Sequence, residues 1–393
     1  MAAARKRVVK RIGGKAQRLG LVLSGGGARG AFQVGVYEEL LADRRFAGGP
    51  RVLSGTSAGA INSSLIAAGK TPDEIMDFWN GIADNPPAVA SARFFHTAMR
   101  TILELAVRES FKSLVTPQRW STFWQRVRNH MPPQPGSLLA FFCEYLLTSR
   151  FDVVSQILEG IREPFLASTA QLRERLVETF EGEKVPNRGQ VHVAINTVDA
   201  HSGQVVRYAT TRTPLTRPPE YVIVDAITVD MVLASASIPL LFPPVPIGSH
   251  LLWDGGLLVN TPLAPVVAMG ADEIITVLVT EPPDPSSSQF EHFGRAVERT
   301  VDSFLENAYN VDRKLLLERN RLAALEGSGY RAVTLYDAVR PDRDGSFSAG
   351  SYLYFKRDEL ERMRQAGRRA GRRWLAAGPR VDRLAEPAAG AAA

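Results

Sequence analysis

Two short apolar runs near the start of the chain each end in glycines and lead directly into a helical pattern. The first is LVLSGGGARG at 21–30, and an apolar periodicity typical of a helix follows it over 31–44. The second is RVLSGTSAG at 51–59, and a helix is predicted over 58–68. Strands that alternate with helices in this way predict an α/β fold, with a parallel sheet covered by helices on both faces.

The alternation of strands and helices returns in the second half of the chain. A hairpin is predicted from VHVAINTV at 191–198 and QVVRYATT at 204–211, because a turn sequence, DAHSG, separates the two runs. The segment 85–164 differs from this pattern, since it is helical and rich in aromatic residues, and it is predicted to be a helical insertion. Further strands are predicted at 251–256 and 272–280, and further helices from 71 onward and over 225–239, 262–270, 293–325 and 355–375.

The length of the chain, 393 residues with 45% hydrophobic and 22% charged content, suffices for one large α/β domain or two average ones. The pattern divides it into a basic tail at 1–17, a main domain at 18–325, a C-terminal extension with a basic helix at 326–380 and an Ala-rich, disordered end at 381–393. Cys143 is the single cysteine, which excludes an intramolecular disulfide and a paired-cysteine metal or redox site.

The positive charge of the chain is concentrated in two segments. Residues 1–20 carry seven Lys or Arg and no acid, and 356–375 carry eight basic and three acidic residues, so the remainder sums to 6 − 7 − 5 = −6. Either these segments are solvated surface, or they attract the protein to an anionic lipid surface by roughly 1 kcal/mol per basic residue. Nucleic acid is the weakest alternative, because no recognised nucleic-acid module accompanies the charge.

The sequence carries neither a membrane-spanning segment nor a general export signal. No apolar stretch reaches the roughly 18 to 20 residues that a spanning helix requires, and the basic N-terminus lacks the apolar segment of a secretory signal. The sequence therefore predicts a cytoplasmic protein, peripheral to a membrane if it meets one. Export by a specialised secretion system would leave no readable signal.

The glycine-rich loop leaves its backbone open to close approach by a ligand, which is either a dinucleotide or the oxyanion formed during attack on an ester. Gly25, Gly27 and Gly30 satisfy the G-x-G-x-x-G spacing of a dinucleotide site. Such a site needs an acidic residue about 20 positions further on to hold the ribose, where this chain has Ser57 and its small neighbours. The loop is better explained as an oxyanion hole, in which N–H groups from among Gly25, Gly26 and Gly27 face a carbonyl oxygen as it gains charge.

The sequence GTSAG has the G-x-S-x-G pattern of a nucleophile elbow, in which a sharp turn between strand and helix lifts the serine out of the sheet. Ser57 is therefore the candidate nucleophile, at a helix N-terminus that favours negative charge. None of the six histidines lies in a recognisable triad context. Asp254 in WDGG is the candidate base, because a dry pocket raises the pKa of a carboxyl toward useful values. A plain turn is the other interpretation of Asp-Gly-Gly.

Together, GGGARG, GTSAG and DGG resemble the three signature motifs of the patatin-like phospholipases, in the same order and the same strand or helix context. LASASIPLLFPP at 233–244 is similar to the segment of small residues and prolines that precedes the last motif in that family. NTP at 260–262 follows it in the usual way. The resemblance covers about residues 18–84 and 165–280.

The resemblance implies a three-layer α/β/α fold and a phospholipase A-type lipid acyl hydrolase with a serine–aspartate dyad, needing no metal or other cofactor. Ser57 carries over as nucleophile, Asp254 as the base that activates it and later the hydrolytic water, and the amides of Gly25 to Gly27 as the oxyanion hole. Arg29 holds the family's basic position in the loop, where it orients the loop, meets a lipid phosphate or forms a structural ion pair. The implied partner is a phospholipid or other acyl lipid.

Two other functions stay open at this point. A general carboxylesterase or thioesterase would use the same dyad on soluble substrates, and a non-catalytic lipid-binding protein would need no dyad. We also expect 85–164 to form a helical cap beside the active site. His250 lies four residues before Asp254, and a strand between them would separate the two side chains by about 13 Å, too far for a shared hydrogen bond.

Overall fold

The computed structural model describes residues 17–85, 165–211, 220–282, 293–325, 327–343, 347 and 349–383, together with 96, 97, 99–101, 104, 159 and 161. The chain forms two compact units, of which unit 1 comprises 1–86, 172–237 and 244–393, and unit 2 comprises 87–171 and 238–243. Nearly all of the predicted insertion at 85–164 lies outside the described residues, and so do 1–16 and 384–393. The fold and site described below belong to unit 1.

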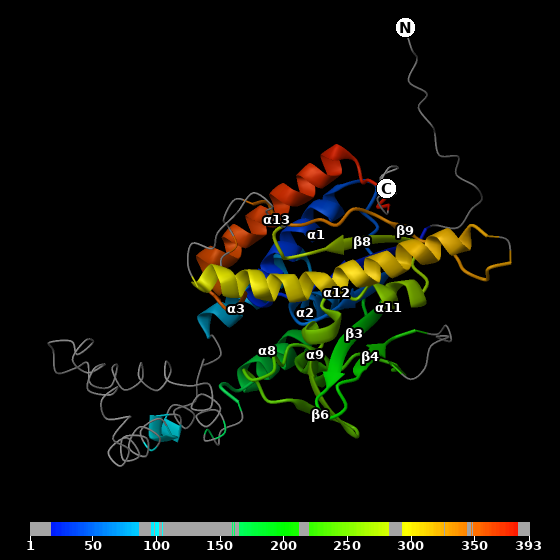
Figure 1. Ribbon diagram of the computed structural model, residues 1–393. Coiled ribbons are helices and arrows are strands. Elements are labelled where there is room, and N and C mark those ends of the chain that lie inside the picture. Colours follow the sequence, from blue (N-terminus) through cyan, green and yellow to red (C-terminus); the bar gives the residue numbers. More distant parts are fainter. Residues whose placement is uncertain are drawn as a thin grey trace, which may run out of the picture. The chain divides into compact units, whose positions relative to one another are not determined.

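A mainly parallel sheet forms the centre of unit 1 (Figure 1). Its described strands are β1 (Leu19–Leu23), β2 (Val52–Gly55), β3 (His192–Asp199), β4 (Val205–Ala209), β5 (Tyr221–Ile223), β6 (Val245–Ile247), β7 (His250–Asp254), β8 (Glu273–Val277) and β9 (Thr334–Leu335). Their order is β5-β4-β3-β2-β1-β8-β9. β1, β2, β3, β8 and β9 are parallel, β4 and β7 run antiparallel to β3, and β6 pairs with β7.

Helices cover both faces of this sheet. They are α1 (Gly30–Ala42), α2 (Ala58–Ala67), α3 (Pro72–Asp84), α8 (Ala170–Phe180), α9 (Val229–Ser235), α10 (Gly256–Val259), α11 (Leu263–Ala268), α12 (Phe293–Ala323) and α13 (Arg357–Ala377), with the 3-10 helices η1 (Gly27–Arg29) and η3 (Ala349–Tyr352). Leu21 and Leu23 of β1 pack into one core with α1, α2, α3 and α13. Val22 packs into the other core with α11 and α12. A strand buried on both faces reads as a continuous apolar run, which is what β1 shows.

The predicted α/β fold with three layers and a mainly parallel sheet is confirmed. The hairpin is present as β3 and β4, and Thr71 and Glu74 form the capping box that begins α3. The helix predicted over 225–239 is shorter at both ends, because Thr228 accepts the N–H of Met231 and caps α9, which begins at Val229, four residues later than expected, and ends at Ser235. β5, β6 and β9 were not predicted, since runs of two or three residues carry too little periodicity.

The C-terminal helix α13 packs tightly on α1 within the same unit. A Cβ at Gly35 would lie 2.0 Å from the Arg364 carbonyl oxygen, and a Cβ at Gly367 would lie 2.0 Å from that of Phe32. Basic side chains between 356 and 373 form ion pairs with carboxylates of the protein itself. The pairs are Arg357–Asp84, Arg362–Glu359, Arg364–Asp73, Arg368–Glu39, Arg372–Glu39 and Arg373–Asp342. This helix therefore offers far less free positive charge to a lipid surface than its sequence indicates.

Candidate active site

The turn after β2 places Ser57 at the N-terminus of α2 in a constrained backbone conformation. Ser57 has φ +55° and ψ −124°, a region that costs a non-glycine residue of order 1–3 kcal/mol. The flanking glycines make the turn sterically feasible. A Cβ at Gly55 would lie 2.1 Å from the Gly59 carbonyl oxygen, and a Cβ at Gly59 would lie 2.1 Å from that of Leu23. The backbone therefore has the sharp geometry that the G-x-S-x-G pattern predicts.

Hydrogen bonds among buried polar groups stabilise the turn that contains Ser57. The Ser57 amide donates to the Ser235 hydroxyl at 3.0 Å, and that hydroxyl donates to the Asn196 carbonyl oxygen at 2.7 Å. The Asn196 side chain donates to the Gly55 carbonyl oxygen at 2.8 Å and accepts from Arg207 at 2.9 Å. No sequence motif predicts these supporting residues. Only Ser235 had a signal, its place in the segment of small residues at 233–244.

Asp254 lies at the end of β7, opposite Thr197 of β3, and its carboxyl lies near enough to the Ser57 side chain for Ser57 to lower its pKa. It is 4% exposed. Burial raises the pKa of Asp254 to about 6, although the nearby Ser57 side chain and the Gly256 amide, which donates to the carboxyl at 2.7 Å, lower it. The structure thus brings the two predicted dyad residues together. It gives the carboxyl a pKa at which it is ionised at neutral pH and still able to accept a proton.

Close backbone approaches fix the Asp-Gly-Gly turn against the nucleophile turn. A Cβ at Gly255 would lie 2.6 Å from the Asn196 carbonyl oxygen. The Thr56 hydroxyl donates to the Val259 carbonyl oxygen at 2.7 Å, which ties the residue before Ser57 to α10. The two turns are therefore held in one position by their neighbours, as a catalytic pair requires.

The glycine loop also borders Ser57, since a Cβ at Gly25 would lie 3.1 Å from the Ser57 Cβ. The Gly25 amide, however, donates to the Asn260 carbonyl oxygen at 3.0 Å. This bond removes Gly25 from the predicted oxyanion donors in this conformation and leaves the amides of Gly26 and Gly27. Gly27 has φ +54°, and a Cβ there would lie 2.0 Å from the Tyr352 carbonyl oxygen, so a side chain would displace the loop.

Arg29 is fully buried behind this loop. Its guanidinium donates to the Ser351 hydroxyl at 2.8 Å and to the Val279 carbonyl oxygen at 3.1 Å, and it pairs with Asp302 at 3.5 Å. It also lies 3.7 Å above the centre of the Tyr352 ring. These contacts fit the loop-orienting and ion-pair interpretations of Arg29, and its burial leaves a lipid phosphate no access to it.

His250 begins the strand that Asp254 ends. Its Nδ1 lies 2.9 Å from an oxygen of Asp199. The backbone N–H of Ser202, followed by His250, holds the pKa of Asp199 well below its usual range. His250 is therefore engaged with a different carboxylate from the candidate base.

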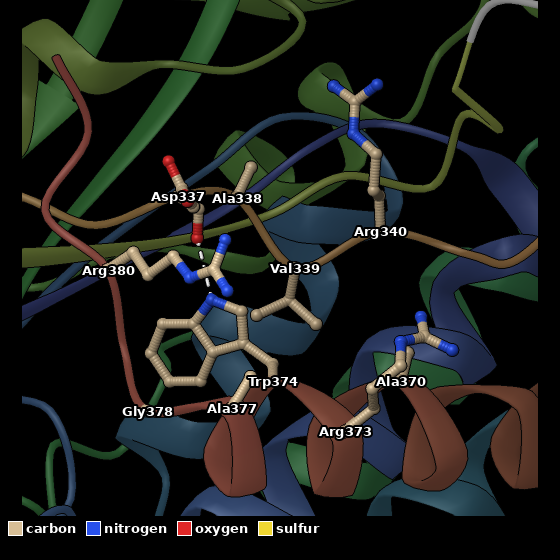
Figure 2. Close-up of a pocket in the computed structure, with 10 residues that line it drawn as sticks. All are labelled: Asp337, Ala338, Val339, Arg340, Ala370, Arg373, Trp374, Ala377, Gly378 and Arg380. Carbon is tan, nitrogen blue, oxygen red and sulfur yellow. Dashed lines mark hydrogen bonds between the residues drawn. The ribbon is translucent and has the colours of Figure 1, made fainter.

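A pocket of about 290 Å³ lies between α13 and the segment 337–340, and it contains none of the predicted site residues (Figure 2). The Trp374 indole N–H donates across it to the Asp337 carbonyl oxygen at 2.8 Å. Two of the arginines that line it already have acidic partners, because Arg340 pairs with Glu306 and Arg373 with Asp342. We therefore assign no anionic ligand to this pocket.

Within the described ranges, no group of three or more His, Cys, Asp or Glu side chains is placed to hold a metal ion. No described helix combines the length and the apolar character that crossing a membrane would require.

Comparison with known proteins places this fold in a family. A family model of patatin-like phospholipases matches residues 21–267, more than half of the chain. The chain therefore belongs to the patatin-like phospholipase family, and at that level it is a lipid hydrolase. A search among curated proteins found no match.

Similar solved structures are distant in sequence. VipD from Legionella pneumophila is 15% identical, with 90% of this chain and 67% of that chain covered and a TM-score of 0.35. The type III effector protein ExoU is 16% identical, with 91% and 53% covered and a TM-score of 0.33. ExoU in its heterodimeric complex with SpcU, from the type III secretion system of Pseudomonas aeruginosa, is 16% identical, with 79% and 56% covered and a TM-score of 0.25. This chain thus spans about half to two thirds of those chains, and such TM-scores carry no argument about its function.

Proposed function

We propose that the protein is a phospholipase A-type acyl hydrolase that cleaves fatty-acyl esters of phospholipids through Ser57 and Asp254. The observation that carries this proposal is the position of the Ser57 side chain beside the buried carboxyl of Asp254, whose pKa burial raises to about 6. A general base works best when its pKa lies near the operating pH. The family supports lipid esters as the substrate class.

The geometry supports a two-step reaction. Asp254 accepts the hydroxyl proton while the Ser57 oxygen attacks the ester carbonyl carbon, and the amides of Gly26 and Gly27 stabilise the oxyanion. Collapse of this intermediate breaks the ester bond, and the departing lysolipid alkoxide takes the proton from Asp254. In the second step Asp254 deprotonates a water that attacks the acyl-enzyme. The fatty acid leaves as the proton returns to Ser57.

Two alternatives use parts of the same site. A carboxylesterase or thioesterase acting on soluble substrates would keep the dyad but would not accelerate when its substrate aggregates. A non-catalytic lipid-binding protein is disfavoured by the buried carboxyl beside Ser57, because burying the Asp254 carboxyl costs free energy that binding alone does not require.

The test is hydrolysis of a mixed phospholipid panel by purified protein, with fatty acid and lysolipid identified by mass spectrometry. We expect release from the wild type and none from Ser57→Ala or Asp254→Asn. His250→Ala is the matched control on the same strand and should keep most activity, because His250 contacts Asp199. A fluorophosphonate probe should label Ser57 in the wild type. Near-normal turnover by folded Asp254→Asn, or inactive folded His250→Ala, would contradict the proposed base.

A further inference from the structure

The long helix α12 carries a row of large apolar side chains on its solvent side. The residues are Val301, Phe304, Val311, Leu315 and Leu322, here named the α12 apolar stripe. Their spacing of three, seven, four and seven residues places them on one face of the helix. Phe304 is 75% exposed and Leu315 is 65% exposed. Soluble proteins expose single apolar residues routinely, but five on one face of a helix over six turns are more than that routine exposure, although the exposed Glu318 lies between Leu315 and Leu322 on the same face.

This stripe does not hold α12 to the protein. The opposite side of the helix does so, with Tyr309, Leu316 and Leu317 in the core beneath the sheet. Asp302 and Glu306 are also buried there, as partners of Arg29 and Arg340. α12 crosses the sheet on the face opposite α1 and α13 (Figure 1). An ordinary surface helix would carry polar residues where the stripe lies.

Hydrogen bonds and packing connect the same helix to the candidate catalytic centre. Asp302 accepts hydrogen bonds from Arg29, behind the glycine loop, and from the Tyr352 hydroxyl. α12 also packs against α10, which follows directly after Asp254 and Gly255. Leu257 and Leu258 of α10 are themselves exposed. The oxyanion loop is therefore connected to α12 through Arg29, and the base is connected to α12 through α10.

We propose that the α12 apolar stripe is the surface with which the protein docks onto a phospholipid membrane. The inference rests on the proposed function, because the ester bonds of phospholipids are presented at such a surface. The side chains that neighbour Leu315 and Leu322 include three basic residues, Lys314, Arg319 and Arg321, and two acidic ones, Asp312 and Glu318, of which Glu318 pairs with Arg321 at 3.0 Å. A row of Phe, Leu and Val flanked by Lys and Arg is the composition of helices that lie in a lipid interface. Its 21-residue span gives about 32 Å of contact.

The test compares two double variants of α12 that add the same charge. Phe304→Asp with Leu315→Asp places both carboxylates in the stripe. Ser303→Asp with Asn310→Asp places them on exposed positions outside it. Each pair is made in the Ser57→Ala background, so that lipid is not consumed, and sedimented with vesicles of phosphatidylcholine alone or with phosphatidylserine. The same pairs in the active protein are assayed on vesicles and on a soluble short-chain ester.

We expect the stripe variant to lose vesicle binding at least about tenfold, since two apolar side chains no longer enter the lipid, while the control binds like the parent. Binding of the parent to neutral vesicles should persist at about 0.5 M salt, where surface charge is screened. Soluble-ester hydrolysis should change less than twofold in both variants, because the dyad is untouched.

Equal vesicle binding by the stripe variant and the control would overturn the docking surface. If the parent is a dimer that the stripe variant dissociates without loss of vesicle binding, the stripe is an interface between copies of the chain and the proposal is wrong. Absence of ester hydrolysis in the protein with Ser57 intact would instead contradict the proposed function. Vesicle sedimentation would still decide the docking surface by itself.

Discussion

The candidate catalytic centre and the α1–α13 contact both depend on glycines that let backbone atoms approach closely, but they use that closeness in opposite ways. At the centre, Gly55 and Gly59 allow Ser57 an unfavourable φ of +55°. At the α1–α13 contact, Gly35 and Gly367 let two helices meet in ordinary helical geometry. The first arrangement costs stability and the second supplies it.

Charge shows the same contrast between the two regions. Burial raises the pKa of Asp254 to about 6, and no cation is among the groups that shift this pKa. Along α13, carboxylates meet arginines, and the pair of Arg368 and Arg372 lowers the pKa of Glu39. Proteins commonly accept local destabilisation where chemistry needs it and compensate elsewhere. Substitutions in the two regions should therefore separate activity from stability.

The largest expected effect is on activity alone. Ser57→Ala and Ser57→Gly should each reduce lipid hydrolysis by at least about a thousandfold, because the nucleophile is lost. The two should differ in stability. Glycine adopts the positive φ without penalty, so Ser57→Gly should be more stable than Ser57→Ala by about 1–2 kcal/mol in urea unfolding. Equal stability of the two variants would argue against a strained turn.

The next effect should fall on stability alone. Gly367→Ala should lower the free energy of unfolding by about 2–4 kcal/mol, because its new methyl group would meet the Phe32 backbone and force the helices apart. Gly371→Ala is the matched control on the same helix, where the nearest atom is a Glu39 side-chain carbon at 3.1 Å. We expect that change to be neutral or stabilising. Below its melting temperature, Gly367→Ala should retain its activity per folded molecule.

A smaller effect should be a pH-dependent change in stability that originates at Asp254. The pKa of Asp254 is raised in the folded state from 3.8 to about 6, so ionising it opposes folding. This cost is absent below about pH 4, grows between pH 4 and 6 and is complete above pH 6. Asp254→Asn should therefore stabilise the protein by up to about 3 kcal/mol at pH 8 and by much less at pH 4.5. Denaturant unfolding at both pH values measures the difference, and an equal gain at both would show that desolvation is not the cause.

Activity should follow the same ionisation in the wild type. Asp254 works as a base only when deprotonated, so hydrolysis should fall as pH drops through about 6. A fall centred near 4 instead would indicate a solvated carboxyl.

Much of this organisation could be predicted from the sequence, because its signals are local. The run before the glycine loop, the capping box at Thr71 and the strand–turn–helix context of Ser57 each depend on a few adjacent residues. Asp254 needed more, since only the combination of three motifs separated it from a plain turn.

The rest depended on contacts that a sequence pattern does not contain. The Gly25 amide donates to the carbonyl oxygen of Asn260, more than 200 positions away. The sequence therefore could not show which of the three glycine amides is free to act as an oxyanion donor. Arg364 meets Glu38 across more than 300 positions, and the basic pattern of α13 therefore indicated a free charged surface. The apolar stripe of α12 was hidden because periodicity does not show which face of a helix is buried.

The smallest expected effect concerns how much the arginines of α13 contribute to the stability of the fold. Arg364 is 15% exposed and bridges Glu38 and Asp73, whereas Arg372 is 59% exposed and meets Glu39. Arg364→Gln should lower the free energy of unfolding by about 1 kcal/mol, because it leaves the partly buried Glu38 with a weaker partner. Arg372→Gln should leave the melting temperature unchanged, since water and salt screen an exposed pair and Arg368 still contacts Glu39. Neither variant should alter hydrolysis per folded molecule. A loss of activity in folded Arg372→Gln would mean that α13 acts on the catalytic centre and does more than support the fold, and the contrast between the two regions would then no longer hold.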